Sequence, residues 1–144
     1  MNERVEISNS EWELMRILWT LQAATSRQII DLLAEKLGWK EATTKTYISR
    51  LVTKKYVKTE KRGRAYLYLP AVEEEATITE QLLASFAKIC QKHIGQTLAN
   101  VVREIPLSQA DIEEVSRILA AKQKTAPLEL ECDCLPKGHK AKHC

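Results

Sequence analysis

The sequence predicts a mostly α-helical chain with one β-hairpin, and three observations support that fold class. Apolar residues recur at three- and four-residue steps along most of the chain, which is typical of amphipathic helices. Strand-like alternation is confined to residues 56–69. Gly and Pro number only four each in 144 residues, which argues against a disordered or fibrous chain. The length suits one compact domain with an accessory segment.

The first 70 residues predict three helices. Ser8 and Glu11 have the spacing of a capping box, and the apolar residues that follow predict a helix through about Trp19. Thr25 and Gln28 repeat that spacing before a second helix, which Gly38 ends. A third helix follows Trp39, in which a buried stripe is expected to comprise Ile48, Leu51 and Val52.

A β-hairpin is predicted to follow the third helix. Residues 56–60 and 64–69 are β-prone, and the turn between them contains Gly63, a residue suited to a positive φ. Three short helices, of which the third is basic, followed by a hairpin with a cationic tip are typical of a winged helix-turn-helix DNA-binding domain. We expect that domain over residues 1–70, and Pro70 with the acidic residues 73–75 marks its end.

The charge distribution points to a polyanionic partner for this first part. Residues 1–70 carry 13 Lys and Arg against 8 Asp and Glu, whereas residues 71–144 carry 9 against 11. The stripe on the third helix turns hydroxyls and cations to its other faces, where they suit a DNA groove. These residues are Thr43, Lys45, Thr46, Ser49 and Arg50. A basic helix face that is merely solvated is the alternative.

Residues 71–124 predict a helical dimerisation region. Apolar spacing predicts one helix from about Ile78 to Arg103, Pro106 breaks it, and Ser108 with Asp111 caps a last helix. The two helices have little core of their own to cover, so we expect a homodimer; packing onto the first domain is the alternative. Cys90 lies on the apolar stripe with His93 near it, and a buried thiol is favoured there over a ligand pair.

Residues 125–144 form an irregular, Cys/His-rich tail. Cys132 and Cys134 place two thiols on one side of an extended backbone, and a turn at residues 135–138 is expected to return the later ligands towards them. Thiolates favour Cu(I) and Zn(II). The predicted metal-site residues are Cys132, Cys134, His139, His143 and Cys144. A disordered tail without a regulatory role is the alternative.

Four motifs in order resemble the penicillinase-repressor (BlaI/MecI/CopY) family of bacterial winged-helix repressors, over roughly residues 5–125. They are SNSEWELMRILW, TSRQIIDLL, WKEATTKTYISRLVTKKYV and KRGRAYLYLP, and the tail sequence ECDC resembles the CopY-type copper-responsive members. The resemblance implies DNA contact by Thr43, Lys45, Thr46, Ser49 and Arg50, with Arg62 and Arg64 on the wing. It also implies a homodimer on an inverted-repeat operator.

Two positions depart from the family pattern. Thr44 stands where Val or Ile usually faces the core, which either costs packing or places another hydroxyl near the DNA. The family's second C-x-C pair is replaced by His139 and Ala141, so the four-thiolate site is not reproduced within the tail.

The function expected from these features is a dimeric repressor of copper-homeostasis (copper export) genes. Zinc belongs to the repressing form and Cu(I) to the released form, with a copper chaperone as the candidate Cu(I) donor. The alternatives are a repressor that answers thiol oxidation or proteolysis, as in β-lactam-resistance regulators, and a metal-buffering module. Catalytic motifs are absent, so we do not expect an enzyme. Without an apolar signal core or membrane span, a cytoplasmic protein is expected.

Overall fold

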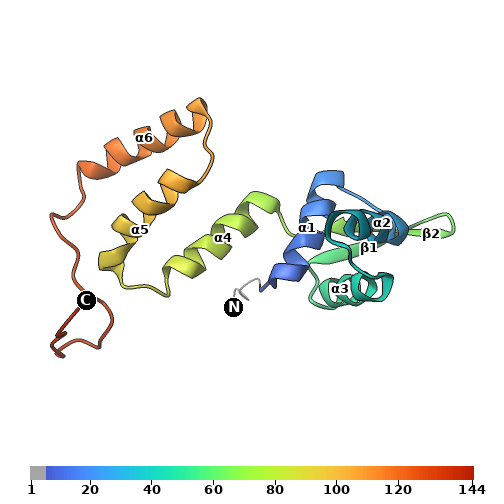
Figure 1. The fold of residues 1–144 in the computed structure, drawn as a ribbon, viewed down its shortest axis with the longest axis horizontal. Helices are drawn as coiled ribbons and strands as arrows, with labels where there is room; N and C mark the ends of the chain where they lie inside the picture. The colour runs from blue at the N-terminus through green and yellow to red at the C-terminus, as the bar shows by residue number, and fades with distance from the viewer. Residues whose placement is uncertain (1–5) are drawn as a thin grey trace. The chain divides into compact units, whose positions relative to one another are not determined.

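The computed structural model describes residues 6–144, so the first five residues of the predicted 1–70 domain lie outside it. Contacts divide the chain into one compact unit up to Gln81 and a second unit from Leu82 to Cys144. The elements in order are α1 (Asn9–Leu21), α2 (Ser26–Leu37), α3 (Glu41–Thr53), β1 (Val57–Arg62), β2 (Ala65–Pro70), α4 (Glu74–Phe86), α5 (Gln91–Glu104) and α6 (Gln109–Gln123) (Figure 1). The predicted fold class, mostly helical with one hairpin, is confirmed.

The core of the first unit lies between α1, α2, α3 and the start of β1. Each of the three helices contributes buried apolar side chains at helical spacing and so buries one face against the others. The core residues are Leu14, Met15, Leu18 and Trp19 of α1, Ile29 and Leu33 of α2, Ile48 and Leu51 of α3, and Val57 of β1, with Ile7 and Ala24 beside them. This is the predicted winged-helix arrangement.

The predicted helix starts are confirmed where a side chain caps the helix. The side chains of Ser8 and Thr25 accept hydrogen bonds from the backbone N–H groups of Glu11 and Gln28, respectively. In return, the side chains of Glu11 and Gln28 accept hydrogen bonds from the backbone N–H groups of Ser8 and Thr25, which completes two capping boxes. Gly38 ends α2 in the left-handed conformation, at φ 69° and ψ 22°. These local signals determine where α1 and α2 begin and where α2 ends.

The hairpin is a two-stranded antiparallel ribbon with Arg62 paired to Ala65. Gly63 therefore opens a two-residue loop, and its φ of +64° is one that a side chain would disfavour. At the other end of the hairpin, Tyr68 exchanges two backbone hydrogen bonds with Ala24, of 2.8 and 3.0 Å. The base of the wing is thus attached to the loop between α1 and α2, and its tip is exposed.

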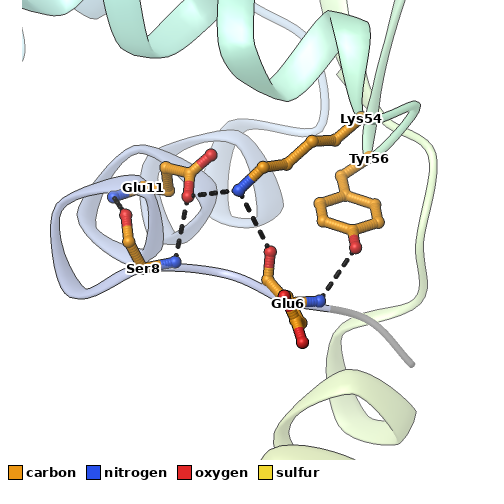
Figure 2. A network of polar contacts seen from close by, with 5 residues as sticks. All are labelled: Glu6, Ser8, Glu11, Lys54 and Tyr56. Carbon is orange, nitrogen blue, oxygen red and sulfur yellow. Dashed lines mark hydrogen bonds and ion pairs between the residues drawn. The ribbon is translucent and has the colours of Figure 1, made fainter.

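A polar network joins the start of α1 to the end of α3 (Figure 2). The side chain of Glu11 is 2% exposed, and its Oε1 accepts from Lys54 Nζ at 2.8 Å and from the Ser8 amide at 3.0 Å. Lys54 also reaches the carbonyl of Glu6 at 3.3 Å, while the Glu6 amide donates to the Tyr56 hydroxyl at 2.8 Å. Burial raises the pKa of Glu11, but the hydrogen bonds from Lys54 and Ser8 outweigh it and lower the pKa below its ordinary value.

Thr44 is fully buried in α3, so it faces the core and not a ligand on the helix surface. Its hydroxyl oxygen has no hydrogen-bond partner among the described residues. Since an unpaired buried hydroxyl costs free energy, Thr44→Val is expected to raise the free energy of unfolding by about 1 kcal/mol. Urea unfolding of Thr44→Val and of Thr43→Val, at an exposed neighbouring position, measures this. A loss of stability in Thr44→Val would contradict it.

The predicted continuous helix from Ile78 to Arg103 is wrong, because α4 ends at Phe86 and α5 begins at Gln91. After Phe86 the amides of Lys88 and Ile89 bond back only three residues, to Ser85 and Phe86, which closes the helix. Cys90 then takes a non-helical conformation and becomes the N-cap of α5. The apolar spacing continues through this break, so periodicity does not reveal it.

Helices α5 and α6 have amphipathic sequences but bury no residue. Apolar side chains that are 40–56% exposed line both helices: Leu98, Val101 and Val102 on α5, Ile112, Val115, Ile118 and Leu119 on α6. In the described part of the chain, no helix has the length and hydrophobicity that a membrane span requires. Beyond Gln123 the tail is irregular, as predicted.

Candidate nucleic-acid interface and metal centre

The outer face of α3 carries small side chains at its centre and cations at its edges. Thr43, Lys45, Thr46, Ser49 and Arg50 are all exposed, as their spacing predicts. At about 3.6 residues per turn, the centre of this face opposite the buried stripe comprises Ala42, Thr46, Ser49 and Thr53. The set predicted from the sequence omits Ala42 and Thr53, although the same helical spacing places them there. A face of this kind lets the helix backbone approach a groove closely, with charges at its margins.

Neighbouring side chains hold the cations at the edges of α3. The guanidinium of Arg50 lies over the ring of Tyr47, 5.3 Å from its centroid. Lys45 Nζ lies 3.6 Å from a carboxylate oxygen of Glu41, which also accepts a 2.6 Å hydrogen bond from Arg27. The hydrogen bond from Arg27 is the main reason why the pKa of Glu41 is lowered, so Glu41 stays ionised near neutral pH. The exposed cations Lys45 and Arg50 therefore have partners on α3 itself.

The hydroxyl of Thr46 is already engaged within α3. It donates a 3.0 Å hydrogen bond to the carbonyl of Ala42. Its methyl group and the lone pairs of its oxygen, which can only accept a hydrogen bond, remain for an external partner. Thr46 thus keeps its predicted place on the surface with a reduced hydrogen-bonding capacity.

The wing continues the surface of α3. Arg62 and Arg64 are exposed at the hairpin tip, and Arg62 Nε lies 3.8 Å from a Glu60 carboxylate oxygen. A groove joins the helix to the hairpin, lined by Ser26, Lys45, Ile48, Ser49, Val52, Thr53, Thr59 and Tyr68. All seven residues predicted to bind DNA thus lie exposed in one unit, and their contact with DNA stays a prediction.

A cluster of four cysteines lies in the second unit. The Sγ atoms of Cys90, Cys132, Cys134 and Cys144 all lie within 4.8 Å of one another. Cys90 Sγ is 2.8 Å from Cys144 Sγ, and Cys134 Sγ is 3.8 Å from the same atom. Four soft sulfur donors gathered this closely suit one Zn(II) or Cu(I). A tetrahedral zinc–thiolate site separates its sulfurs by about 3.8 Å, which matches the Cys134–Cys144 separation, whereas Cys90 and Cys144 lie closer than that. We call these four residues the cysteine cluster.

The cysteine cluster differs from the predicted ligand set in two ways. Cys132, Cys134 and Cys144 come together as expected, but the fourth sulfur belongs to Cys90, which the sequence indicates only as a buried thiol. Cys90 is indeed 9% exposed, and it lies beside the tail. His139 lines a pocket beside Cys132, while neither His139 nor His143 belongs to the cluster. Their role as ligands stays a prediction.

The redox state of the cluster determines what it can bind. Cys132 and Cys144 are joined as a disulfide, with their Cα atoms 6.2 Å apart, whereas Cys90 and Cys134 are free. The hydrogen-bonding interaction with the Cys90 thiol is the main cause that raises the pKa of Cys134, and desolvation and the charge of Asp133 raise it further. Because metals bind thiolates, a metal needs this disulfide reduced and the thiols deprotonated.

Comparisons with known proteins place the chain in a family. The family model described as penicillinase repressor matches residues 7–121. The chain is 45% identical, over 91% of its length and 90% of the relative, to an uncharacterised 16.5 kDa protein of Latilactobacillus sakei. It is 31% identical, over 84% of its length and 98% of the relative, to the methicillin resistance regulatory protein MecI of Staphylococcus aureus strain N315.

Among solved structures, the CopR repressor aligns with 39% identity and a TM-score of 0.40, covering 48% of this chain and all of that one. The family model extends from the segment before α1 through most of α6, which is well over half of the chain. The chain therefore belongs to the penicillinase repressor family of transcriptional repressors.

Proposed function

We propose that the protein is a dimeric, copper-responsive repressor of copper-homeostasis genes. It binds an inverted-repeat operator through α3 and the wing, and it is released when Cu(I) replaces zinc at the cysteine-rich tail. Family membership supports the repressor, and the cysteine cluster is the observation that carries the response to metal.

DNA binding is supported by the form and charge of the first unit. Nine Lys and Arg against two Glu lie between Lys40 and Arg64, a segment that contains α3 and the wing tip. Small side chains at the centre of α3 suit contact with base edges, whereas Arg50 and the wing arginines suit phosphates or guanine. Thr43, Lys45, Thr46, Ser49, Arg50, Arg62 and Arg64 are the proposed DNA-binding residues.

Dimer formation is supported by the uncovered apolar faces of α5 and α6. Side chains such as Val101 and Ile118 are too exposed to contribute to a core within one chain. A second copy offers the same face, so a two-fold interface would bury both. Two α3 helices would then meet two half-sites of an inverted repeat.

The metal response is supported by the chemistry of the cysteine cluster. Thiolates select Cu(I) and Zn(II) over harder cations, and the two ions differ in the number of sulfurs they take. Zn(II) favours four ligands, whereas Cu(I) is satisfied by two or three. Exchange of one ion for the other would therefore rearrange the tail. A copper chaperone as the Cu(I) donor stays a prediction without further support.

The Cys132–Cys144 disulfide favours a second candidate, a repressor that responds to oxidation. In that case the two thiols transfer two electrons and two protons to an oxidant such as a peroxide, and metal binding is only a side property. Within the described residues, no comparable observation favours release by proteolysis or a metal-buffering module.

Binding to a promoter fragment of copper-homeostasis genes tests the proposal. Reduced, zinc-loaded protein is expected to bind that fragment at least about 1,000-fold more tightly than random duplex at moderate salt, and Cu(I) is expected to abolish the preference. The double variant Cys132→Ser, Cys134→Ser should stay bound in Cu(I), whereas the control His93→Ala should be released like the wild type. Footprinting and fluorescence anisotropy measure both.

The outcomes separate the candidates. Affinity that is unchanged by Cu(I) in the wild type and in the double variant would contradict the copper response. Release by hydrogen peroxide without copper would favour the oxidation-responsive repressor. The lack of a preference for any promoter fragment over random duplex would contradict the repressor itself.

A further inference from the structure

Cys90 lies at the point where the tail meets the helical part of the second unit. It is the N-cap of α5, and its side chain makes no capping hydrogen bond to the helix. Its Sγ instead lies 2.8 Å from Cys144 Sγ, although 54 residues separate the two in sequence. A lone buried thiol needs no such neighbours, whereas a metal ligand does.

Polar contacts independent of sulfur dock the tail at this helix end. The backbone amide of Gln91 donates to Asp133 Oδ1 at 3.1 Å, and the Gln91 side-chain amide donates to the Glu131 carbonyl at 2.6 Å. The two acceptors flank Cys132, and Asp133 separates Cys132 from Cys134. These hydrogen bonds therefore hold the tail beside Cys90 without the help of a metal. The carboxylate of Asp133 also suits the positive end of the helix dipole.

We propose that the metal centre is a four-thiolate site in which Cys90 is the fourth ligand, in place of the tail histidines. This inference rests on the proposed metal response and deepens it by naming the ligand that the helical region supplies. The tail supplies three sulfurs, and Cys90 supplies the fourth from the N-cap position of α5. Four thiolates complete the coordination of Zn(II), so His139 and His143 have no vacant position to fill.

The centre gives the metal a direct connection to α5. Cys90 begins the helix that also carries exposed Leu98, Val101 and Val102, the apolar residues proposed for the dimer interface. A metal held by Cys90 and three tail cysteines fixes the tail to the start of that helix. A metal ion that binds fewer than four sulfurs would leave either Cys90 or a tail cysteine unbound. The signal thus reaches the dimerisation helix through a bond to its first residues.

The same geometry makes metal binding and oxidation exclude one another. The Cys132–Cys144 disulfide occupies two of the four sulfurs, so a four-thiolate centre forms only after its reduction. Reduction breaks the S–S bond and adds two electrons and two protons, which a dithiol reductant supplies in the experiment below. Oxidised protein should therefore lose the metal.

Cobalt(II), a spectroscopic probe for zinc sites, tests the ligand set in the reduced full chain. The wild type should bind one Co(II) per chain with the visible absorption of a tetrahedral site and a sulfur-to-metal charge-transfer band. Cys90→Ser should lose about a quarter of that band, one thiolate of four. It should also weaken binding by more than the roughly 10–100-fold that an outer-shell partner is worth. The matched control, His139→Ala with His143→Ala, should match the wild type.

Alkylation of the wild type provides a test without a variant. Zn(II) should slow the reaction of Cys90 with iodoacetamide along with that of the three tail cysteines, as followed by mass spectrometry. Equal alkylation rates of Cys90 with and without Zn(II) would overturn its role as a ligand. Loss of the tetrahedral spectrum in the histidine variant, with Cys90→Ser unchanged, would overturn it as well but leave the metal-responsive tail intact. Failure of the reduced wild type to bind Co(II), Zn(II) or Cu(I) would overturn both the centre and the proposed copper response.

Discussion

Replacing Lys54 with Met is expected to lower the free energy of unfolding by roughly 3 kcal/mol, because it leaves the buried carboxylate of Glu11 without its ion-pair partner. Lys54 Nζ is 2.8 Å from a Glu11 carboxylate oxygen, and that side chain is 2% exposed. The second oxygen of the same carboxylate has no hydrogen-bond partner among the described residues, so the charge depends on Lys54 and the Ser8 amide. Methionine keeps the length of the side chain but leaves a buried charge unpaired.

Urea unfolding measures the effect, with Lys36→Met as the matched control. Lys36 is about as exposed as Lys54 and forms a 3.1 Å ion pair with Glu13. The Glu13 side chain is 28% exposed, so solvent can compensate its charge and the loss should cost at most about 1 kcal/mol. Equal effects of the two substitutions would show that the burial of Glu11 does not matter. Restored stability in the double variant Lys54→Met, Glu11→Met would attribute the loss to the unpaired charge.

The difference between Lys54→Met and the wild type should shrink in acid. The lowered pKa of Glu11 stabilises the wild type above the ordinary carboxyl value of 4.5, and this contribution is lost as the pH falls through the lowered pKa. Without Lys54, only the hydrogen bonds with Ser8 counteract the effect of burial, so the pKa of Glu11 is higher in the variant. The variant therefore loses less free energy of unfolding than the wild type as the pH falls and Glu11 takes up a proton. Unfolding free energies compared at neutral pH and below pH 4.5 give the sign.

Arg50→Ala is expected to weaken operator binding by roughly tenfold to a hundredfold per half-site, and the effect multiplies in a dimer. The guanidinium lies over the ring of Tyr47, which limits its motion before DNA is bound. Truncation removes both the charge and its ordered position. Fluorescence anisotropy with the promoter fragment at fixed salt measures the change in dissociation constant.

Arg117→Ala is the matched control, because Arg117 is an exposed arginine on α6 that pairs with Glu114 at 3.2 Å. It should leave the dissociation constant within about twofold. A second comparison, with random duplex, separates the possible contacts of Arg50. Loss confined to the promoter fragment indicates base contact, whereas equal loss on both duplexes indicates phosphate contact. An unchanged affinity for both would remove Arg50 from the interface.

Local signals make the first unit predictable from the sequence. The capping boxes at Ser8 and Thr25 each involve residues three apart, and the outer face of α3 follows from helical spacing. Gly63 identifies the hairpin turn because a positive φ there favours a residue without a side chain. The exposure of all seven proposed DNA-binding residues follows from the same short-range patterns.

The remaining features depend on contacts between distant residues, which periodicity does not reveal. The Glu11–Lys54 pair spans 43 residues, and the meeting of Cys90 with Cys144 spans 54. The break before α5 is hidden because apolar residues continue across it at helical spacing. Spacing alone therefore places Cys90 on the apolar stripe. It does not show that the tail, which follows α6 in sequence, packs beside Cys90.

The first turn of α5 has a nonlocal start, since Asp133 accepts the Gln91 amide from 42 residues away. A truncated chain that ends at Lys124 would lose three cysteines together with this carboxylate, so the helix would be prone to fray from its amino end. A tail deletion therefore cannot separate the loss of metal binding from the loss of stability at the start of α5. Single-atom changes such as Cys to Ser leave Asp133 in place and keep the two effects apart.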